Sequence, residues 1–297
     1  MTPELLGRLA PFREAALRAG IPPEDVERWI STACPTATLV TGGDGPVAGR
    51  FGGPLMLPPD APDPWYPLLA SLDCAALPDS VTGLQTPPDG HLLLFGFPND
   101  GYTRGNGGGE VRYIPAGTPV EERRVNYACV FDEGAGGDAG EDLELLRQFP
   151  QDELRVSADV CLPSHCVVMS AGPLYQTAPI PGHPLALDLA EVWDATRHAV
   201  MADGPLHIGG YAFHECTETD PVVDAALEAL EVRRNLVEAG KTVDDEELPA
   251  PEHWTLLAQW DVGLRGREGF TQHWVIPKQD LARRRFDRVH SSGFWNP

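Results

Sequence analysis

Three short elements occur twice in this chain, in the same order. The first set is Phe51-Gly52-Gly53, Leu68-Leu69-Ala70-Ser71-Leu72-Asp73, and the apolar run 91–97 after Gly90. The second set is Ile208-Gly209-Gly210, Leu256-Leu257-Ala258-Gln259-Trp260-Asp261, and the run 270–276 after Gly269. An ordered recurrence predicts that the two regions fold alike. Two copies are too few for a solenoid, so we expect an internal duplication packed into one body.

The composition favours short strands joined by many turns. Hydrophobic residues make up 42% of the 297 residues, which is enough for a substantial core. The chain also holds 31 glycines and 30 prolines, residues that interrupt long helices. Regular strand–helix–strand spacing is absent. The predicted class is therefore α+β, with mostly antiparallel β-sheets formed by two related halves.

Helices are predicted at the N-terminus and in an insertion of the second half. Residues 3–19 form a helical arm broken at Pro11, and another helix follows Pro22-Pro23. The clearest helix spans 220–239, because Asp220 can cap it, Pro221 takes its first position and Gly240 follows its end. Its predicted apolar stripe is Val223, Ala226, Leu227, Leu230 and Val237.

Further elements complete the predicted order. Helices are expected at 141–149, 187–199 and 279–289, and strands at 36–41, 51–59, 68–72, 90–97, 110–114, 125–131 and 166–169. In the last helix Leu281 and Phe286 should face inward, and Arg283, Arg284, Arg285 and Arg288 should face solvent. Residues 1–44 are predicted as an N-terminal helical arm and 45–297 as one body, with halves at about 45–175 and 200–297.

The net charge limits the classes of partner. There are 44 acidic and 22 basic side chains, giving a formal charge of −22, and Lys241 and Lys278 are the sole lysines. Such a chain repels phosphate backbones and anionic lipid, so nucleic acid and membrane surfaces are not expected partners. An acidic face could instead serve as a solubilising surface or capture a basic protein.

The chain also carries no sign of export. Charged residues interrupt its first twenty positions, and no apolar run approaches the ~20 residues that span a bilayer. Six cysteines are scattered without a paired framework, which is typical of reduced thiols. We expect a cytoplasmic protein.

The motifs give no strong sign of catalysis or of a cofactor. Each Gly-Gly pair leads into an extended segment and lacks the spacing of a phosphate-binding loop, so a bulge or close crossing is the favoured interpretation. His207, His214 and Cys216 lie near one another in sequence, as do Cys161 and Cys166, but neither group has the paired spacing of a zinc site. The sequence also lacks Gly-x-Ser-x-Gly. No metal, cofactor or catalytic residue is predicted.

Asp73 and Asp261 end the two Leu-rich strands at matching places. They could meet as a carboxylate pair, or each could cap the turn that follows by accepting backbone N–H bonds. Alternation along the strand places Gln259 and Asp261 on one face and Trp260 on the other. The candidate binding residues are Asp73, Tyr211, Gln259, Trp260 and Asp261. The rings of Trp65, Trp260 and Tyr211 could line a ligand-binding groove or belong to the core.

The repeated elements and their surroundings resemble the YwqG-like family, a bacterial domain of unknown function. The resemblance rests on Phe51-Gly52-Gly53-Pro54, Trp65-Tyr66-Pro67-Leu68-Leu69 and Pro88-Asp89-Gly90-His91-Leu92 in the first half. In the second half it rests on His207-Ile208-Gly209-Gly210-Tyr211 and Leu256-Leu257-Ala258-Gln259-Trp260-Asp261. It covers residues 45–295. Ser71 departs from the Gln of the family pattern, so a site built from two symmetric glutamines is not expected. The resemblance implies an α+β body, a cytosolic home and no established activity.

The predicted function is that of a non-enzymatic binding protein whose acidic surface neutralises a basic protein partner. The alternative is a small-molecule binder or an enzyme with its site at the seam between the two halves, where pockets often form.

Overall fold

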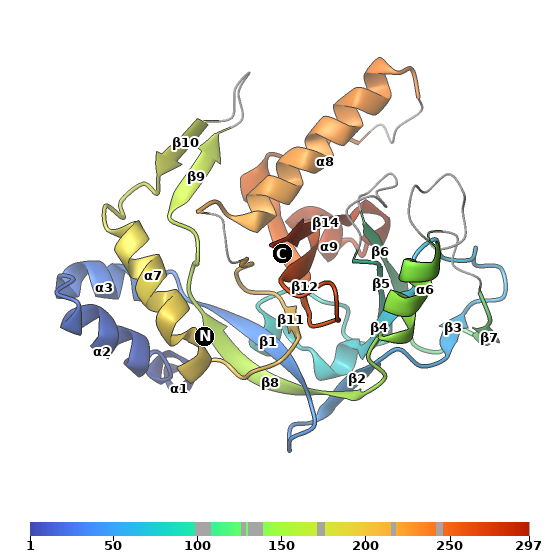
Figure 1. Ribbon diagram of the computed structural model, residues 1–297, viewed down its shortest axis with the longest axis horizontal. Helices are drawn as coiled ribbons and strands as arrows, with labels where there is room; N and C mark the ends of the chain where they lie inside the picture. Colours follow the sequence, from blue (N-terminus) through green and yellow to red (C-terminus); the bar gives the residue numbers. More distant parts are fainter. Residues whose placement is uncertain are drawn as a thin grey trace.

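A ten-stranded sheet forms the centre of the molecule, in the order β14-β13-β12-β11-β1-β8-β2-β4-β5-β6 (Figure 1). The computed structural model describes residues 1–98, 108–125, 129, 139–170, 176–214, 218–241 and 246–296. Neighbouring strands of the sheet pair antiparallel, which confirms the predicted class of mixed helix and mainly antiparallel sheet. The strands are β1 (Cys34–Thr41), β2 (Val47–Phe51), β4 (Leu68–Asp73), β5 (His91–Gly96), β6 (Gly109–Ile114), β8 (Glu153–Cys161), β11 (Leu206–Ile208), β12 (Trp254–Val262), β13 (Phe270–Pro277) and β14 (His290–Trp295).

From either edge of the sheet inward, four strands follow one another in descending chain order before the two central strands are reached. One end holds β2, β4, β5 and β6 and the other holds β11, β12, β13 and β14, each set in chain order. Between them lie β1 and β8, which pair antiparallel over eight residues each. Strand β1, which precedes β2 in the chain, borders β11, and strand β8, which precedes β11, borders β2. Each central strand therefore lies beside the set that does not directly follow it in the chain.

The Gly-Gly pairs and the Leu-Leu-Ala segments contact each other in the same way at both ends. The register of β4 shifts between Leu68 and Ala70, and that of β12 shifts between Leu256 and Ala258. The carbonyl of the bulged leucine accepts the N–H of the first glycine: Gly52 donates to Leu69 at 2.7 Å, and Gly209 donates to Leu257 at 3.2 Å. All four glycines of the two pairs have positive φ, a conformation that favours glycine. The glycines are therefore not the bulge, which lies at Leu69 and Leu257; Gly209 makes a close crossing instead, since a Cβ there would lie 2.1 Å from Thr82 O.

The sheet curls until its two ends meet at β6 and β14. Gly108 N donates to Ser291 O at 3.1 Å, and the Trp274 indole donates to Phe95 O at 3.2 Å. This close approach depends on Gly109, because a Cβ there would lie 2.5 Å from Phe95 O and 2.8 Å from Trp274 Nε1. The fully buried Trp274 therefore fills the seam between the two ends of the sheet.

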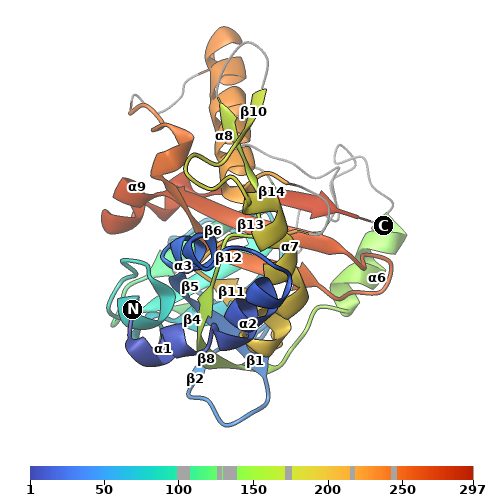
Figure 2. The same ribbon diagram turned by 90° about the vertical axis from the view of Figure 1, so that its left-hand side faces the viewer.

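Helices α1 (Pro3–Gly7), α2 (Ala10–Arg18), α3 (Pro23–Ile30) and α7 (Ala186–Thr196) form a layer beside β1 and β8 (Figure 2). Phe12, Trp29 and Trp193 are buried there against Val160 and Leu162. The arm is broken near Pro11, as predicted. The helices end at Ile30, and the strand predicted at 36–41 is β1, which is hydrogen-bonded on both sides within the sheet.

Helix α8 (Pro221–Glu238) confirms the helix predicted at 220–239. The Asp220 side chain accepts the Val222 N–H, and Gly240 has φ 68°. The predicted stripe is wrong in its second half, since the buried residues are Pro221, Val222, Ala225, Ala226, Leu227 and Ala229, whereas Val237 is 54% exposed. The helix projects away from the sheet (Figure 1), and its buried residues all lie between 221 and 229.

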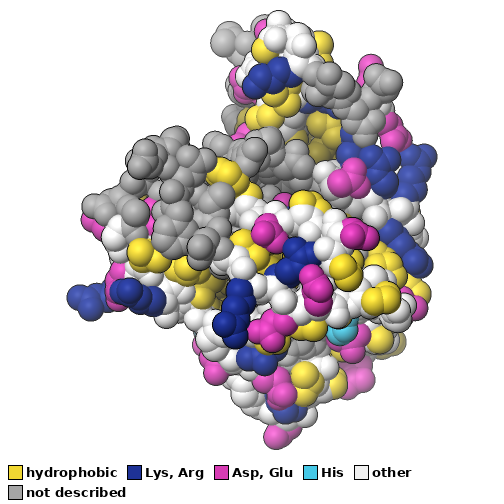
Figure 3. Space-filling model, turned by 90° about the vertical axis from the view of Figure 1, so that its right-hand side faces the viewer, with side chains coloured by type: hydrophobic (Ala, Val, Ile, Leu, Met, Phe, Trp, Pro, Cys, Tyr) yellow, Lys and Arg dark blue, Asp and Glu magenta, His cyan; other side chains and the backbone are white. Residues whose placement is uncertain are grey.

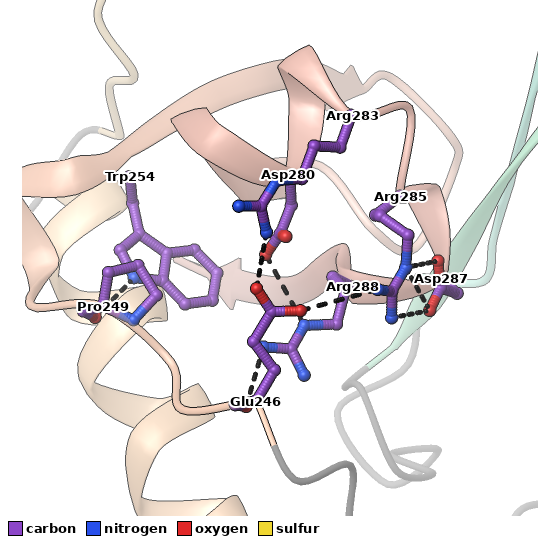
Figure 4. Close-up of polar contacts among 8 residues, drawn as sticks. All are labelled: Glu246, Pro249, Trp254, Asp280, Arg283, Arg285, Asp287 and Arg288. Carbon is purple, nitrogen blue, oxygen red and sulfur yellow. Dashed lines mark hydrogen bonds and ion pairs between the residues drawn. The ribbon is translucent and has the colours of Figure 1, made fainter.

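The predicted helix 279–289 is wrong. Helix α9 (Lys278–Ala282) ends early, Arg284 adopts φ 60°, and a short 3-10 turn, η4 (Phe286–Arg288), follows. Leu281 and Phe286 are buried as expected. Arg288, expected in solvent, is buried because it pairs with the fully buried Asp280 at 3.5 Å and donates to Glu246 O (Figure 4).

Several predicted elements are recovered, and the strands β7, β8, β10, β11 and β14 were missed. Helix α6 (Ala139–Arg147) and strands β3 (Leu55–Leu57) and β9 (Val167–Ser170) lie in predicted segments, with β7 (Glu121–Arg123) and β10 (Gln176–Pro179) as their additional partners. Strands β8, β11 and β14 had no prediction. Most of the predicted strand 125–131 lies outside the described residues. In the described part of the chain, no helix is both long and apolar enough to cross a bilayer.

The seam makes Gly109 sensitive to one added methyl group. We expect Gly109→Ala to lower the free energy of unfolding by about 2 kcal/mol, because the new Cβ overpacks Trp274 and the Phe95 carbonyl. Urea titration measures the change. Gly263→Ala is the control, since no atom lies within 4 Å of a Cβ built there. Equal midpoints for the two variants would contradict this account of the seam.

Candidate functional site

An acidic cleft lies between α7 and the segment that follows β11. We define it as two adjoining hollows of about 390 Å³ and 160 Å³ that share Arg197 and Phe213. The larger hollow is lined by His198, Met201, Ala202, Asp203, Gly204, His207 and Asp261 in addition to the shared pair. The smaller is lined by Ser164, Cys166, Leu187, Ala190, Glu191, Asp194, His214 and Glu218.

Carboxylates outnumber cations in the cleft. Asp203 and Asp261 line the larger hollow, and Glu191, Asp194 and Glu218 line the smaller. Arg197 is the single arginine or lysine among these lining residues, and its Nε lies 3.2 Å from Asp194 Oδ1. Five acids against one arginine give the cleft a negative potential that attracts cations.

A stacked pair divides the two hollows. The Arg197 guanidinium carbon lies 3.9 Å from the centroid of the Phe213 ring. A guanidinium over an aromatic face is held by the ring quadrupole, and its edge stays free for hydrogen bonds. Arg197 begins η2 (Arg197–Ala199) directly after α7, so the helix sets its position.

The base of the larger hollow is a chain of hydrogen bonds. Gln259 Nε2 donates to Asp261 Oδ1 at 3.0 Å, and Gln259 Oε1 accepts the Phe213 N–H at 2.9 Å. His207 Nε2 lies 3.5 Å from Asp261 Oδ2. Gln259 is fully buried, whereas the Asp261 side chain is 37% exposed. Gln259 thus holds one oxygen of the carboxylate, His207 lies near the other, and the partly exposed Asp261 side chain lines the hollow.

Strand alternation and register produce this arrangement. His207 of β11 lies opposite Gln259 of β12, which lies opposite His273 of β13, so the three polar side chains share one face. Trp260 points to the opposite face and packs edge-on against Phe149, with ring centroids 5.5 Å apart. The predicted division of Gln259 and Asp261 from Trp260 is what the structure has.

The α7 side of the cleft is fixed by a buried carboxylate. Asp159 of β8 is fully buried, accepts the Ala202 N–H at 3.0 Å, and pairs with Arg8 at 2.7 Å. Arg8 also donates to the carbonyls of Ala158 and Val200, both at 2.6 Å. The N-terminal arm therefore fastens the segment 200–202 that lines the larger hollow.

His273, behind the cleft wall, and His214, which lines the smaller hollow, are neutral at physiological pH. Burial lowers the pKa of His273 to about 4, and burial together with the nearby His273 lowers the pKa of His214 to about 4. His273 Nε2 lies 3.2 Å from Phe213 O, which fits a neutral ring that donates from Nε2. These rings hold the backbone of the wall without adding charge.

The predicted site residues separate into different places. Gln259 and Asp261 meet in the larger hollow, and Tyr211 lies in the same wall segment but sends its hydroxyl to Thr32 O at 2.9 Å. Trp260 is core, so the groove of Trp65, Trp260 and Tyr211 is not formed. Asp73 lies in a third hollow, of about 440 Å³, with Arg50, Ser71, His91 and Glu153 among its lining residues.

Asp73 and Asp261 do not form a shared pair. Four strands lie between β4 and β12 in the sheet, which corresponds to about 24 Å along it at the usual strand spacing. Asp73 Oδ1 accepts the Ala75 N–H at 3.0 Å, as a cap of the following turn. Asp261 instead bonds to the Gln259 side chain, so the two aspartates have different roles.

Sequence reasoning missed Arg197, Asp203 and Phe213 as cleft residues. Arg197 begins η2, Asp203 lies in the loop before β11, and Phe213 lies three residues after the second Gly-Gly pair, so only the tertiary fold brings them to Asp261. His207 was considered as a metal ligand but pairs with Asp261. Within the described ranges, which exclude Cys216, no group of three or more His, Cys, Asp or Glu residues could hold a metal ion.

The chain belongs to a family known as a domain of unknown function (DUF1963), whose model matches residues 49–292. The match spans the outer strands of both ends of the sheet and all of the cleft. A search of the curated proteins finds no match to this chain.

Gln259 is predicted to stabilise the wall of the cleft. Gln259→Ala should lower the free energy of unfolding by about 1–3 kcal/mol, because the Phe213 N–H then loses its acceptor. Ser71→Ala is the matched control, since Ser71 occupies the corresponding place in β4. Urea titration of both variants tests this, and equal losses would count against the bond from Phe213.

His273 is predicted to make the protein sensitive to acid. Its folded pKa lies below the ordinary value of 6.5, so its contribution to stability is complete above about pH 6.5 and is lost as the pH falls toward 4. Between about pH 7 and pH 5 this loss is on the order of 2 kcal/mol. His273→Gln keeps a donor for Phe213 O and should reduce the loss, as measured by urea unfolding at both pH values. The same loss in variant and wild type would refute the assignment.

Proposed function

We propose that this member of the DUF1963 family is a non-enzymatic binding protein whose acidic cleft takes up a basic segment of a partner protein. The observation that carries the proposal is the set of five carboxylates around a single arginine, with Asp261 held from below by Gln259. A lysine or arginine side chain entering the larger hollow would meet the partly exposed carboxylate of Asp261, and Asp203 lines the same hollow.

The distribution of charge supports the cleft as the binding surface. The whole chain carries −22, so a basic partner is attracted from a distance by a field that salt weakens. On the face that lies on the right-hand side of Figure 1, acidic and basic side chains are interspersed (Figure 3). The same balance disfavours nucleic acid and anionic lipid, and the proposed setting is the cytoplasm.

The shape around the cleft favours a macromolecular partner. Helix α8 and the β9–β10 hairpin project from the same side of the body and stand apart from each other (Figure 1). The residues Cys166, at the foot of the hairpin, and Glu218, which precedes α8, both line the smaller hollow. A bound segment would therefore pass between two projections that can contact the rest of its chain.

A second candidate is a small-molecule site or an enzyme in the larger hollow. It is favoured by the His207–Asp261 pair, an imidazole and a carboxylate 3.5 Å apart at the edge of a space of about 390 Å³. A monomeric amine, such as lysine methyl ester, that binds as tightly as a lysine-rich peptide would support this candidate.

The two ends of the sheet also form part of the proposal. We infer that they arose by duplication of one unit, an idea supported by the matching strand order, the matching bulges and the equivalent glycine N–H bonds. The narrower assignment to YwqG-like proteins, with a bacterial origin, belongs to the same proposal. Only the second copy has the Gln–Asp pair, so binding is assigned to one copy.

Asp261 provides the test of binding. Asp261→Asn should weaken binding of a fluorescent lysine-rich peptide about tenfold, equivalent to about 1.4 kcal/mol, because the counter-ion of the bound cation is lost. The amide oxygen can still accept the bond from Gln259, so the unfolding free energy should change by about 1 kcal/mol or less. Fluorescence anisotropy at low and high salt measures the affinity.

Asp73→Asn is the matched control, because it removes the same charge from the corresponding strand end outside the cleft. A peptide with acetylated lysines is the second control. Equal weakening by the two aspartate variants would show a general charge effect, and equal binding of the acetylated peptide would rule out recognition of cations. Either result overturns the proposal.

A further inference from the structure

Two cysteines face each other across the central strand pair. Cys34 is the first residue of β1, Cys161 is the last residue of β8, and the two are directly opposite in the register. Both are free thiols, with Cys34 partly exposed and Cys161 buried. The pair therefore lies at an end of the ladder, where the strands can adjust more easily than in the middle.

The geometry is close to that of a disulfide. The two sulfur atoms lie 3.5 Å apart. Directly opposed residues of an antiparallel pair have Cα atoms about 4.5–5.5 Å apart, within the range that disulfides span. Among the cysteines that the structure describes, no other two have their sulfur atoms in contact.

The sulfur of Cys161 also contacts the wall of the acidic cleft. It accepts the Tyr211 N–H at 3.3 Å, and a Cβ built on Gly210 would lie 2.7 Å from it. The segment 209–214 is thus packed directly on this sulfur, and two residues beyond Tyr211 it supplies Phe213 to the cleft. A shift of the Cys161 sulfur toward Cys34 would withdraw the acceptor of the Tyr211 N–H.

We propose that Cys34 and Cys161 form a redox site that a small disulfide such as oxidised glutathione converts to an intramolecular disulfide, weakening binding in the cleft. The effect on binding rests on the function proposed above, whereas formation of the bond does not.

The exchange takes place in two steps. The Cys34 thiolate attacks one sulfur of oxidised glutathione, forming a mixed disulfide and releasing one glutathione thiolate. The Cys161 thiolate then attacks the Cys34 sulfur and releases the second. Two protein thiols are oxidised, one glutathione disulfide is reduced to two glutathione molecules, and the two thiol protons pass to the released thiolates.

The environment of the two thiols determines the rate of the exchange with oxidised glutathione. The hydrogen bond with Cys161, together with burial, raises the pKa of Cys34, so little thiolate is present at neutral pH. The exchange should accelerate as the pH rises.

The first experiment asks whether the bond forms in the folded protein. Wild type treated with oxidised glutathione should lose about two mass units, yield a peptide joining residues 34 and 161, and unfold at higher urea concentration. Cys34→Ser and Cys161→Ser should form no intramolecular bond. Cys74→Ser, which removes a buried thiol outside the pair and outside the cleft, should behave as wild type. The proposal is overturned if both thiols stay free while dithiothreitol is oxidised under the same conditions, or if the bond forms only in urea.

The second experiment measures binding of the lysine-rich peptide to the reduced and oxidised wild type. We expect oxidation to lower the affinity at least about threefold, and Cys34→Ser to bind equally well with and without oxidised glutathione. If the bond forms and the affinity is unchanged, the coupling to the cleft is wrong. If neither state binds the peptide, the proposed function fails, while the mass measurement still decides the redox site.

Discussion

The contact between a Gly N–H and the carbonyl of a bulged leucine organises this sheet. At Gly52 and Gly209 the chain leaves a short strand in a left-handed conformation, and the N–H that it turns inward meets the carbonyl of Leu69 or Leu257. The bulge fixes which residues of the Leu-rich strand face the core and which face outward. The polar face of β12, and with it the cleft, depends on that choice.

The repeated motifs made the architecture accessible from the sequence. The Gly-Gly and Leu-Leu-Ala segments recur together because they contact each other through one backbone hydrogen bond. Their recurrence predicts the strands β4, β5, β12 and β13 and their antiparallel pairing. Strand β8 was missed because it carries no repeated element and mixes polar with apolar residues over residues 153–161. Its position at the centre follows from pairing with β1 and β2, which are distant in sequence.

The candidate site was less accessible for a related reason. Period-two alternation correctly put Gln259 beside Asp261, because that relation is local. The partners of this pair, His207, Arg197 and Phe213, reach it only through strand register and the packing of α7. The prediction for the C-terminal helix was wrong because a run of arginines is typical of a solvent-exposed face. Arg288 is instead buried, since it pairs with the buried Asp280.

The contact between β6 and β14 affects how readily the protein associates with other copies of itself. A ten-stranded open sheet ordinarily offers two rows of unpaired backbone groups on which another chain can add a strand. Here the edges turn toward one another, joined by Gly108 and Ser291 and filled by Trp274. Each edge thereby shields the other. Gly108, Gly109 and Trp274, which allow this contact, therefore protect a sheet of many short strands from edge-to-edge aggregation.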